Sequence, residues 1–193
     1  MILETVDQLE EIYSGATPPA AKTVEQNELI PAYAKFIESS PFFLLATVGP
    51  TGLDCSARGD SPGFVRVVDS KTIMFPDRKG NNKIDSLRNM VQDPRVALLF
   101  LFPGTGTIFR LNGRASISTD QALRESFADP EVPATVIVIT VDFVFMQCPR
   151  AITRSRLWDE ASFIDQKSIP SVAQIVSYIK GRDQDEGPGQ PPA

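Results

Sequence analysis

Apolar residues recur every three or four positions in several stretches of the chain, which is the spacing of one buried helical face. Pro31 weakens the early part of the first stretch, because proline lacks the backbone N–H that a helix interior needs. We also expect a short helix at the N-terminus, and a helix after Ser118 that is capped by Thr119 or Asp120. The four predicted helices beyond the N-terminal one cover Val24–Glu38, Asn82–Val91, Thr119–Phe127 and Pro170–Lys180.

Two of these helices carry an apolar stripe of similar spacing. In both, each stripe residue has another one three or four positions away, so that the residues share one helical face. The sequence therefore predicts that each stripe packs against other parts of the protein. The stripes are Ile84, Leu87, Met90 and Val91 in one helix, and Val172, Ile175, Val176 and Ile179 in the other.

The remaining apolar stretches are short and bounded by turn residues, which is typical of strands. Asn112-Gly113 separates two of them and is a strong signal for a two-residue hairpin. Successive hairpins make antiparallel sheets, so we expect a mainly β fold, a β-barrel with peripheral helices. The predicted strands are Phe42–Val48, Leu53–Arg58, Phe64–Val68, Thr72–Phe75, Val96–Phe102, Thr107–Leu111, Arg114–Ser118 and Thr135–Phe145.

The length of 193 residues suits one main domain with extended ends. We expect residues 1–23 to form an N-terminal helix and a loop, with the loop at 14–23. Residues 24–182 then form the barrel domain. The last stretch, 183–193, is rich in Pro, Gly, Gln and acidic residues, which is typical of a disordered tail.

Charge and cysteine content narrow the function classes. A net charge of −5 argues against generic nucleic-acid binding. No apolar run approaches the ~20 residues that cross a bilayer, and the N-terminus lacks a secretory signal pattern. The two cysteines, Cys55 and Cys148, are too few and too far apart for a disulfide scaffold. We therefore expect a cytoplasmic protein.

The chain contains no histidine. Its absence removes catalysis by a Ser-His-Asp triad and most zinc or haem sites that rely on imidazole ligands. We expect no metal site, and we identify no catalytic residue. Redox or group-transfer chemistry would then depend on a bound cofactor.

One basic turn stands out in this acidic chain. Residues 77–83 contain Arg78, Lys79 and Lys83 and lead from a predicted strand into a predicted helix. Asn81 or Asn82 can cap that helix, whose first N–H groups are free. Gly80 lets a ligand approach the backbone closely. A helix N-terminus, a glycine and basic side chains together favour a phosphate site, although a solvated helix entrance has the same pattern.

Three motifs in order give the chain a family resemblance. They read RGDSPGF over residues 58–64, PDRKGNNK over 76–83, and CPRA followed by RSRLW over 148–158. This order is similar to that of the pyridoxamine 5′-phosphate oxidase-like FMN-binding proteins, in particular a bacterial subgroup. The resemblance covers roughly residues 25–165.

The resemblance implies a split β-barrel that forms a homodimer, with FMN in a cleft between the subunits. It also implies an oxidoreductase that acts on a small molecule or passes electrons to an acceptor. By the same resemblance the partner subunit contributes the turn at 148–151, together with Arg154, Arg156 and Trp158. The implied cofactor-binding residues are Arg58, Gly59, Asp60, Pro76, Asp77, Arg78, Asn81, Asn82, Lys83, Cys148, Pro149, Arg150, Ala151, Arg154 and Trp158.

The chain departs from true pyridoxamine-phosphate oxidases, which use a histidine and arginine pair near the C-terminus for the substrate. Because this chain has no histidine, pyridoxamine phosphate is not the expected substrate. The alternatives are a reductase that uses the deazaflavin coenzyme F420, a flavin or haem binder without catalytic activity, and a purely structural barrel. Simple surface ion pairs remain an alternative for Asp60 and Asp77.

Overall fold

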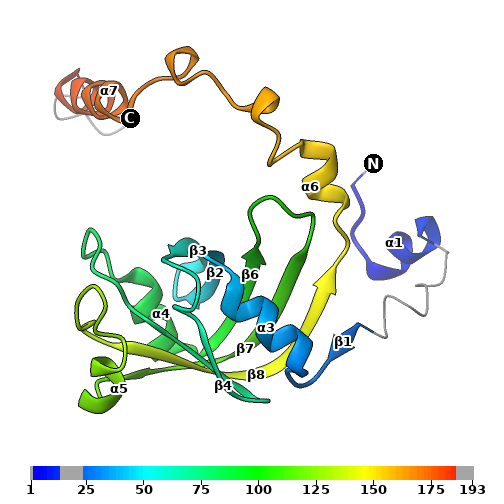
Figure 1. Ribbon diagram of the computed structural model, residues 1–193. Coiled ribbons are helices and arrows are strands. Elements are labelled where there is room, and N and C mark those ends of the chain that lie inside the picture. The colour runs from blue at the N-terminus through cyan, green and yellow to red at the C-terminus, as the bar shows by residue number, and fades with distance from the viewer. Residues whose placement is uncertain (1, 14–23, 186–193) are drawn as a thin grey trace. The chain divides into compact units, whose positions relative to one another are not determined.

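The computed structural model describes residues 2–13 and 24–185 (Figure 1). The predicted loop at 14–23 lies outside the described residues. The chain divides into two compact units, residues 1–151 and 152–193. This division falls inside the stretch 24–182 that the sequence interpretation treats as one domain, so the number of independently folding domains stays a prediction.

The first unit is built on one antiparallel sheet. Its strands are hydrogen-bonded in the order β3-β2-β6-β7-β8-β5-β4, and the short strand β1 pairs with β8. Every pairing is antiparallel, as the succession of hairpins predicts. The strands are β1 Glu25–Gln26, β2 Phe42–Gly49, β3 Gly52–Gly59, β4 Arg66–Asp69, β5 Thr72–Pro76, β6 Arg95–Leu101, β7 Ile108–Ser118 and β8 Val136–Gln147.

In the part of the first unit that the structure describes, four helices accompany this sheet, and each connects or precedes strands. Helix α3 lies between β1 and β2, α4 between β5 and β6, and α5 between β7 and β8. Asp120 caps α5 by accepting a hydrogen bond from the Leu123 N–H at 2.8 Å, as predicted. The helices are α1 Val6–Ile12, α3 Pro31–Ser39, α4 Asp85–Gln92 and α5 Gln121–Glu125.

The core lies on the inner face of the sheet. Alternate side chains of paired strands meet there, as Phe43 of β2 does with Phe100 of β6. Both phenylalanines are fully buried, and Phe75 packs edge-on against Phe43 at 5.0 Å between ring centroids. Burial of this aromatic group removes apolar area from water and so stabilises the sheet.

The predicted hairpin at Asn112-Gly113 is wrong. Both residues lie inside β7, and the register with β8 shifts between them, which leaves Asp142 as the extra residue of a bulge. A Cβ atom at Gly113 would lie 2.3 Å from the Thr140 carbonyl oxygen. The glycine therefore permits close approach of two strands rather than a turn, a second role that glycine has in strands.

Three helix starts differ from the predictions. Helix α3 begins at Pro31 rather than Val24, because proline suits a first helical position and the preceding residues pair with β8. Helix α4 begins at Asp85, with Ile84 at its N-cap and no side-chain cap. Neither Asn81 nor Asn82 caps it, since both lie before the N-cap residue. The C-terminal helix begins at Val172, where Ser171 caps the Gln174 N–H.

The second unit contains the rest of α6 (Arg150–Ser155), two short 3-10 turns at Glu160–Ser162 and Gln166–Ser168, and α7 (Val172–Asp185). Helix α7 includes the first three residues of the predicted tail, and residues 186–193 lie outside the described part. The stripe on α7 is not buried: Val172 is 77% exposed and Ile175 is 47% exposed. Among the described helices, none is both long and apolar enough to cross a membrane.

Candidate functional site

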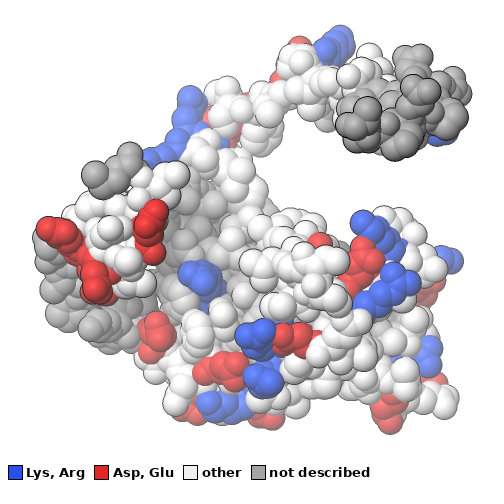
Figure 2. All heavy atoms as spheres, turned by 180° about the vertical axis from the view of Figure 1, so that it is seen from behind, with Lys and Arg blue, Asp and Glu red and all other residues white. Residues whose placement is uncertain are grey.

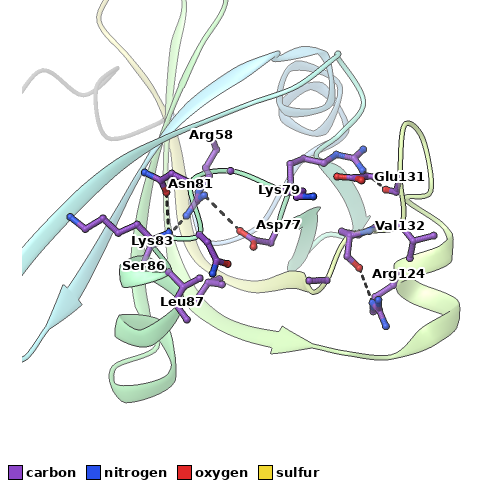
Figure 3. A pocket seen from close by; sticks show the side chains of 16 residues that line it. Arg58, Asp77, Lys79, Asn81, Lys83, Ser86, Leu87, Arg124, Glu131 and Val132 are labelled. Carbon is purple, nitrogen blue, oxygen red and sulfur yellow. Dashed lines mark hydrogen bonds and ion pairs between the residues drawn. The ribbon is translucent and has the colours of Figure 1, made fainter. Parts of the chain in front are cut away.

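A cavity of about 520 Å³ lies where β5 ends and α4 begins. Its size falls in the range of ~300–1,000 Å³ that is typical of small-molecule sites. Figure 3 shows its lining, which comes from four parts of the first unit. These are Arg58 on β3, the turn 77–84 with Ser86 and Leu87 of α4, Arg124 on α5, and residues 131–134 before β8.

The basic turn is shaped by its own backbone. The Asp77 N–H donates to the Thr135 carbonyl at 3.0 Å, which fixes the start of the turn against the strand that follows residues 131–134. Asn82 has a φ of 60°, a left-handed conformation that asparagine tolerates better than most residues. The Asn81 side chain accepts a hydrogen bond from the Lys83 N–H at 3.0 Å. Both asparagines therefore shape the turn that leads into α4.

Basic residues outnumber acidic residues around the cavity. Among the described residues, only two acidic ones line it, Asp77 and Glu131, in a chain whose net charge is −5. On the face shown in Figure 2, by contrast, acidic and basic side chains are interspersed. Such a local excess of positive charge favours an anionic ligand. The basic lining residues are Arg58, Arg78, Lys79, Lys83 and Arg124.

Arg58 projects from β3 into the cavity. It lies 3.7 Å from the Asp77 carboxylate and donates from Nη2 to the Ser86 hydroxyl (Figure 3). Its Nε is buried and has no hydrogen-bond partner among the described residues. A buried N–H without a partner is costly, so a ligand acceptor in the cavity would satisfy a group that the protein leaves unpaired.

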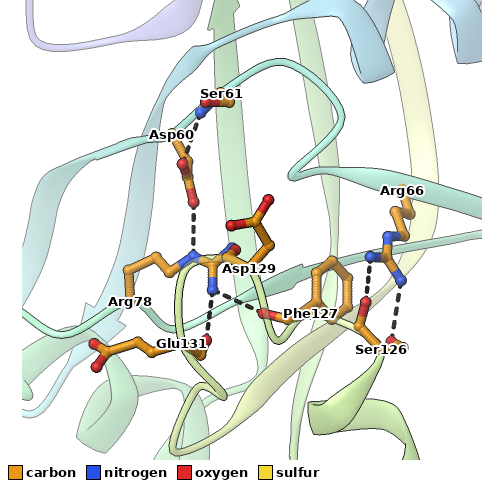
Figure 4. A network of polar contacts seen from close by, with 8 residues as sticks. All are labelled: Asp60, Ser61, Arg66, Arg78, Ser126, Phe127, Asp129 and Glu131. Atoms are coloured by element: carbon orange, nitrogen blue, oxygen red, sulfur yellow. Dashed lines mark hydrogen bonds and ion pairs between the residues drawn. The ribbon is translucent and has the colours of Figure 1, made fainter.

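Arg78, the residue after Asp77 in the turn, has many partners (Figure 4). Its Nε donates to the Asp60 carboxylate at 2.6 Å. Its Nη1 donates to the backbone carbonyls of Phe127 and Glu131 at 2.9 and 3.0 Å, and its Nη2 donates to that of Asp129. Arg78 lines the cavity, but most of its donors are directed at the protein itself.

The two carboxylates beside these arginines have opposite pKa shifts. Burial raises the pKa of Asp77 above its usual value, and the positive charge of Arg58 only partly opposes this shift. Burial also acts to raise the pKa of Asp60, but the hydrogen bonds from Arg78 and from the Ser61 N–H outweigh it and lower that pKa. The ion pairs Arg58–Asp77 and Arg78–Asp60 both form, as the surface-pair alternative expects.

The structure brings together six of the predicted site residues as cavity lining, namely Arg58, Asp77, Arg78, Asn81, Asn82 and Lys83. Pro76 is buried at the end of β5, Gly59 packs close to the Pro41 carbonyl, and Asp60 lies behind Arg78. Within the first unit, the turn that the resemblance assigns to the partner subunit does not line this cavity; it consists of Cys148, Pro149, Arg150 and Ala151. Arg154, Arg156 and Trp158 belong to the second unit, and their role at the site stays a prediction.

Arg124, Ser86 and residues 131–134 are part of the lining that the sequence did not single out. Arg124 donates from Nε to the Pro133 carbonyl at 2.8 Å. The only sequence signal at this wall is the non-periodic, proline-containing segment between α5 and β8. That signal indicates a loop, but it does not say which cavity the loop borders.

The comparison with protein families decides the assignment. The family model described as pyridoxamine 5′-phosphate oxidase matches residues 29–148, which is well over half of the chain. The chain belongs to the pyridoxamine 5′-phosphate oxidase family. Its antiparallel sheet with a few helices is the split β-barrel of that family, as the resemblance implied. The matched range contains the whole basic turn and ends at Cys148.

Solved structures similar to this family member are distant. HupZ from Group A Streptococcus is 19% identical over 61% of this chain and 93% of its own, with a TM-score of 0.49. A Lactobacillus delbrueckii protein, provisionally described as a pyridoxamine 5′-phosphate oxidase, is 20% identical over 62% and 95%, with a TM-score of 0.49. A protein named F420 reductase is 21% identical over 62% and 98%, with a TM-score of 0.45. No curated protein matches the chain.

Proposed function

We propose that this chain binds FMN in the cavity beside the basic turn and acts as an FMN-dependent oxidoreductase on a small molecule. The observation that carries the proposal is the lining itself, in which five basic residues surround a cavity of suitable size in a member of the pyridoxamine 5′-phosphate oxidase family. When bound, FMN supplies hydride and electron transfer. The protein supplies binding, orientation and charge.

The residues present fit such a ligand. The unpaired Nε of Arg58 offers a buried donor at the cavity wall. A Cβ atom built on Gly80 meets no protein atom within 4 Å, so the turn has open space next to its backbone. Lys83 is exposed and pairs with Asp85 at 3.2 Å, a surface contact weak enough to be exchanged for a phosphate.

The roles of these residues follow from their chemistry. Lys79 and Lys83 neutralise the phosphate, with help from the uncapped N-terminus of α4. Asn81 and Asn82 shape the turn that carries both lysines. Arg58 donates to the more buried part of the ligand, and the Asp77 carboxylate, 3.7 Å from the Arg58 guanidinium, holds that guanidinium in place.

FMN binding is tested on the purified protein. Its visible spectrum is recorded, any bound chromophore is released and identified, and the dissociation constant of FMN is measured on the stripped protein. We expect FMN, and we expect Lys79→Ala with Lys83→Ala to weaken it on the order of 100-fold, since two charged contacts are lost. Lys35→Ala, on the exposed face of α3, is the matched control. A colourless protein that ignores added FMN sinks the proposal, and a deazaflavin identifies the F420 alternative instead.

The oxidoreductase part needs its own test. Under anaerobic conditions, NADH or NADPH is mixed with the flavin-loaded protein and the flavin absorbance is followed. Rapid bleaching is expected of a reductase. A flavin that both nicotinamides leave oxidised, although dithionite reduces it, would favour storage or sensing of flavin over catalysis.

We also propose that the protein is a homodimer whose partner contributes residues 148–151, with Arg154 and Trp158, to the site. In support, this turn does not line the cavity of its own chain, and Cys148 and Arg150 are exposed. Mixing of two binding-deficient chains tests the sharing. One carries Lys79→Ala with Lys83→Ala, and the other carries Arg150→Ala. A mixed dimer regains one intact site, so FMN binding should return on mixing. Its failure to return, or elution as a monomer at micromolar concentration, contradicts the shared site.

A further inference from the structure

The loop of residues 127–134 has no regular secondary structure, and its second half, residues 131–134, forms one wall of the cavity. Its backbone carbonyls at every second position accept hydrogen bonds from arginine side chains. Three of them, at Phe127, Asp129 and Glu131, accept from Arg78, and that of Pro133 accepts from Arg124. The wall is therefore held by guanidinium groups instead of by a sheet or a helix.

Most hydrogen-bond donors of Arg78 are already used within the protein and are not free to bind a ligand. A guanidinium carries five N–H donors, and Arg78 directs four hydrogen bonds at Asp60 and the loop. Its charge is matched by the Asp60 carboxylate at 2.6 Å, and the side chain of Arg78 is only 23% exposed. An anion in the cavity would thus meet a neutralised pair here, whereas Lys79 is exposed on the same turn.

We propose that Arg78 is a positioning residue, which holds the 127–134 loop as the wall of the flavin cavity and leaves the phosphate to Lys79 and Lys83. The identity of the ligand rests on the proposed function, whereas the contacts of Arg78 do not. If Arg78 holds the loop, its replacement should weaken the binding of any ligand that lies between the turn and the loop, whether or not the ligand carries a phosphate. Lysine cannot replace it, because one ammonium cannot reach a carboxylate and three carbonyls at once.

The first experiment needs no ligand. The stripped protein is digested with a glutamate-specific protease, and cleavage after the exposed Glu131 is followed by mass spectrometry. Cleavage requires the loop to leave its place, so Arg78→Lys should accelerate it several-fold while circular dichroism shows an intact fold. Arg95→Lys is the control, because Arg95 pairs in a similar way with the Asp93 carboxylate at 2.6 Å, but lies at the start of β6 and does not line the cavity. Equal cleavage rates in the wild type and Arg78→Lys overturn the proposal.

The second experiment distinguishes a role of Arg78 in holding the loop from a direct contact with the phosphate. Dissociation constants of FMN and of riboflavin, which lacks the phosphate, are measured for the wild type, Arg78→Lys and Lys79→Ala with Lys83→Ala. Arg78→Lys should weaken both ligands by the same factor, about tenfold or more, and the lysine pair should weaken FMN alone. If Arg78→Lys loses FMN binding but keeps its affinity for riboflavin, Arg78 contacts the phosphate. If Arg78→Lys keeps its affinity for both ligands, Arg78 has no positioning role. If the wild type binds neither flavin, the proposed function fails, and the proteolysis still decides whether Arg78 holds the loop.

Discussion

Helices α4 and α7 carry apolar stripes of similar helical spacing, but the two stripes differ in burial. Helix α4 packs against β2, β3 and β7. On its stripe, Met90 is 3% exposed and Leu87 packs against the core, whereas Ile84 and Val91 lie outside the covered face, at 39% and 76% exposed. On α7, all four stripe residues are exposed to 42% or more. The periodicity of a helix therefore predicts that an apolar face exists. Whether that face is covered depends on what the rest of the fold places beside it.

Truncation of Met90 should have the largest effect in this comparison. Met90→Ala removes a buried side chain from under α4, and we expect it to lower the free energy of unfolding by about 2–5 kcal/mol. Denaturant titration measures the change. The neighbouring Val91 is 76% exposed, and Val91→Ala should stay within about 0.5 kcal/mol. Equal effects of the two substitutions would contradict the burial of one side of α4.

Gly113 in the barrel and Gly181 in α7 differ in the same way in how closely other atoms approach their backbone. A Cβ atom at Gly113 would overlap the Thr140 carbonyl oxygen and the Ile139 side chain, so Gly113→Ala should destabilise the barrel by about 1–3 kcal/mol. A Cβ atom at Gly181 in α7 meets nothing within 4 Å. Gly181→Ala should therefore raise the helical circular dichroism signal without loss of stability, because alanine favours a helix. Destabilisation by Gly181→Ala would show that α7 is tightly packed.

Burial in the barrel should also be visible in the pH dependence of stability. The pKa of Asp77 is raised on folding, so its ionisation reduces stability as pH rises from the unfolded value near 3.9 through the folded one. At pH values above this window, Asp77→Asn should be more stable than the wild type, by less than the effects expected for Met90→Ala and Gly113→Ala. At pH values below the window, the two proteins should be equally stable. The pKa of Asp60 is lowered, so Asp60→Asn should be less stable at neutral pH, and this deficit should shrink as pH falls below about 3.9. Denaturation midpoints at several pH values test both signs.

The smallest effect is expected on α7. Val172→Ala and Ile175→Ala should each change the free energy of unfolding by less than about 0.5 kcal/mol, since both side chains are largely exposed. Thermal unfolding at two protein concentrations is the measurement. A clear fall in the melting temperature, especially one that depends on concentration, would mean that a second molecule covers the stripe in solution.

Most of the sheet could be predicted, because its strands are short, apolar and separated by strong turns. Val96–Phe102 and Phe42–Val48 match β6 and β2 to within a residue or two. The role of Gly113 is not predictable in the same way, because an Asn-Gly dipeptide suits both a turn and a bulge, and only the pairing with β8 distinguishes them. The start of α3 is not predictable from the helical period alone, because Glu25 and Gln26 also fit that period but pair with β8 as strand β1.

The site was predictable as far as it is local. The turn 77–83 is contiguous in sequence, and its cations, glycine and asparagines are visible there. The opposite wall is not local, because Arg124 and residues 131–134 meet the turn only through the folded sheet. A sequence also cannot show that Arg78 donates hydrogen bonds to backbone carbonyls, because the positions of these carbonyls depend on the fold and not on residue identity.

The contacts of Arg78 join chain positions that are 18, 49, 51 and 53 residues apart. A cavity with such a wall has no precursor in the unfolded chain, where these segments are far from one another. Any molecule that binds there distinguishes native from unfolded chains and stabilises only the native ones, by about 2.7 kcal/mol when its concentration is a hundredfold above its dissociation constant. In the cell, the supply of such a ligand would then help to set how much of this protein survives quality control.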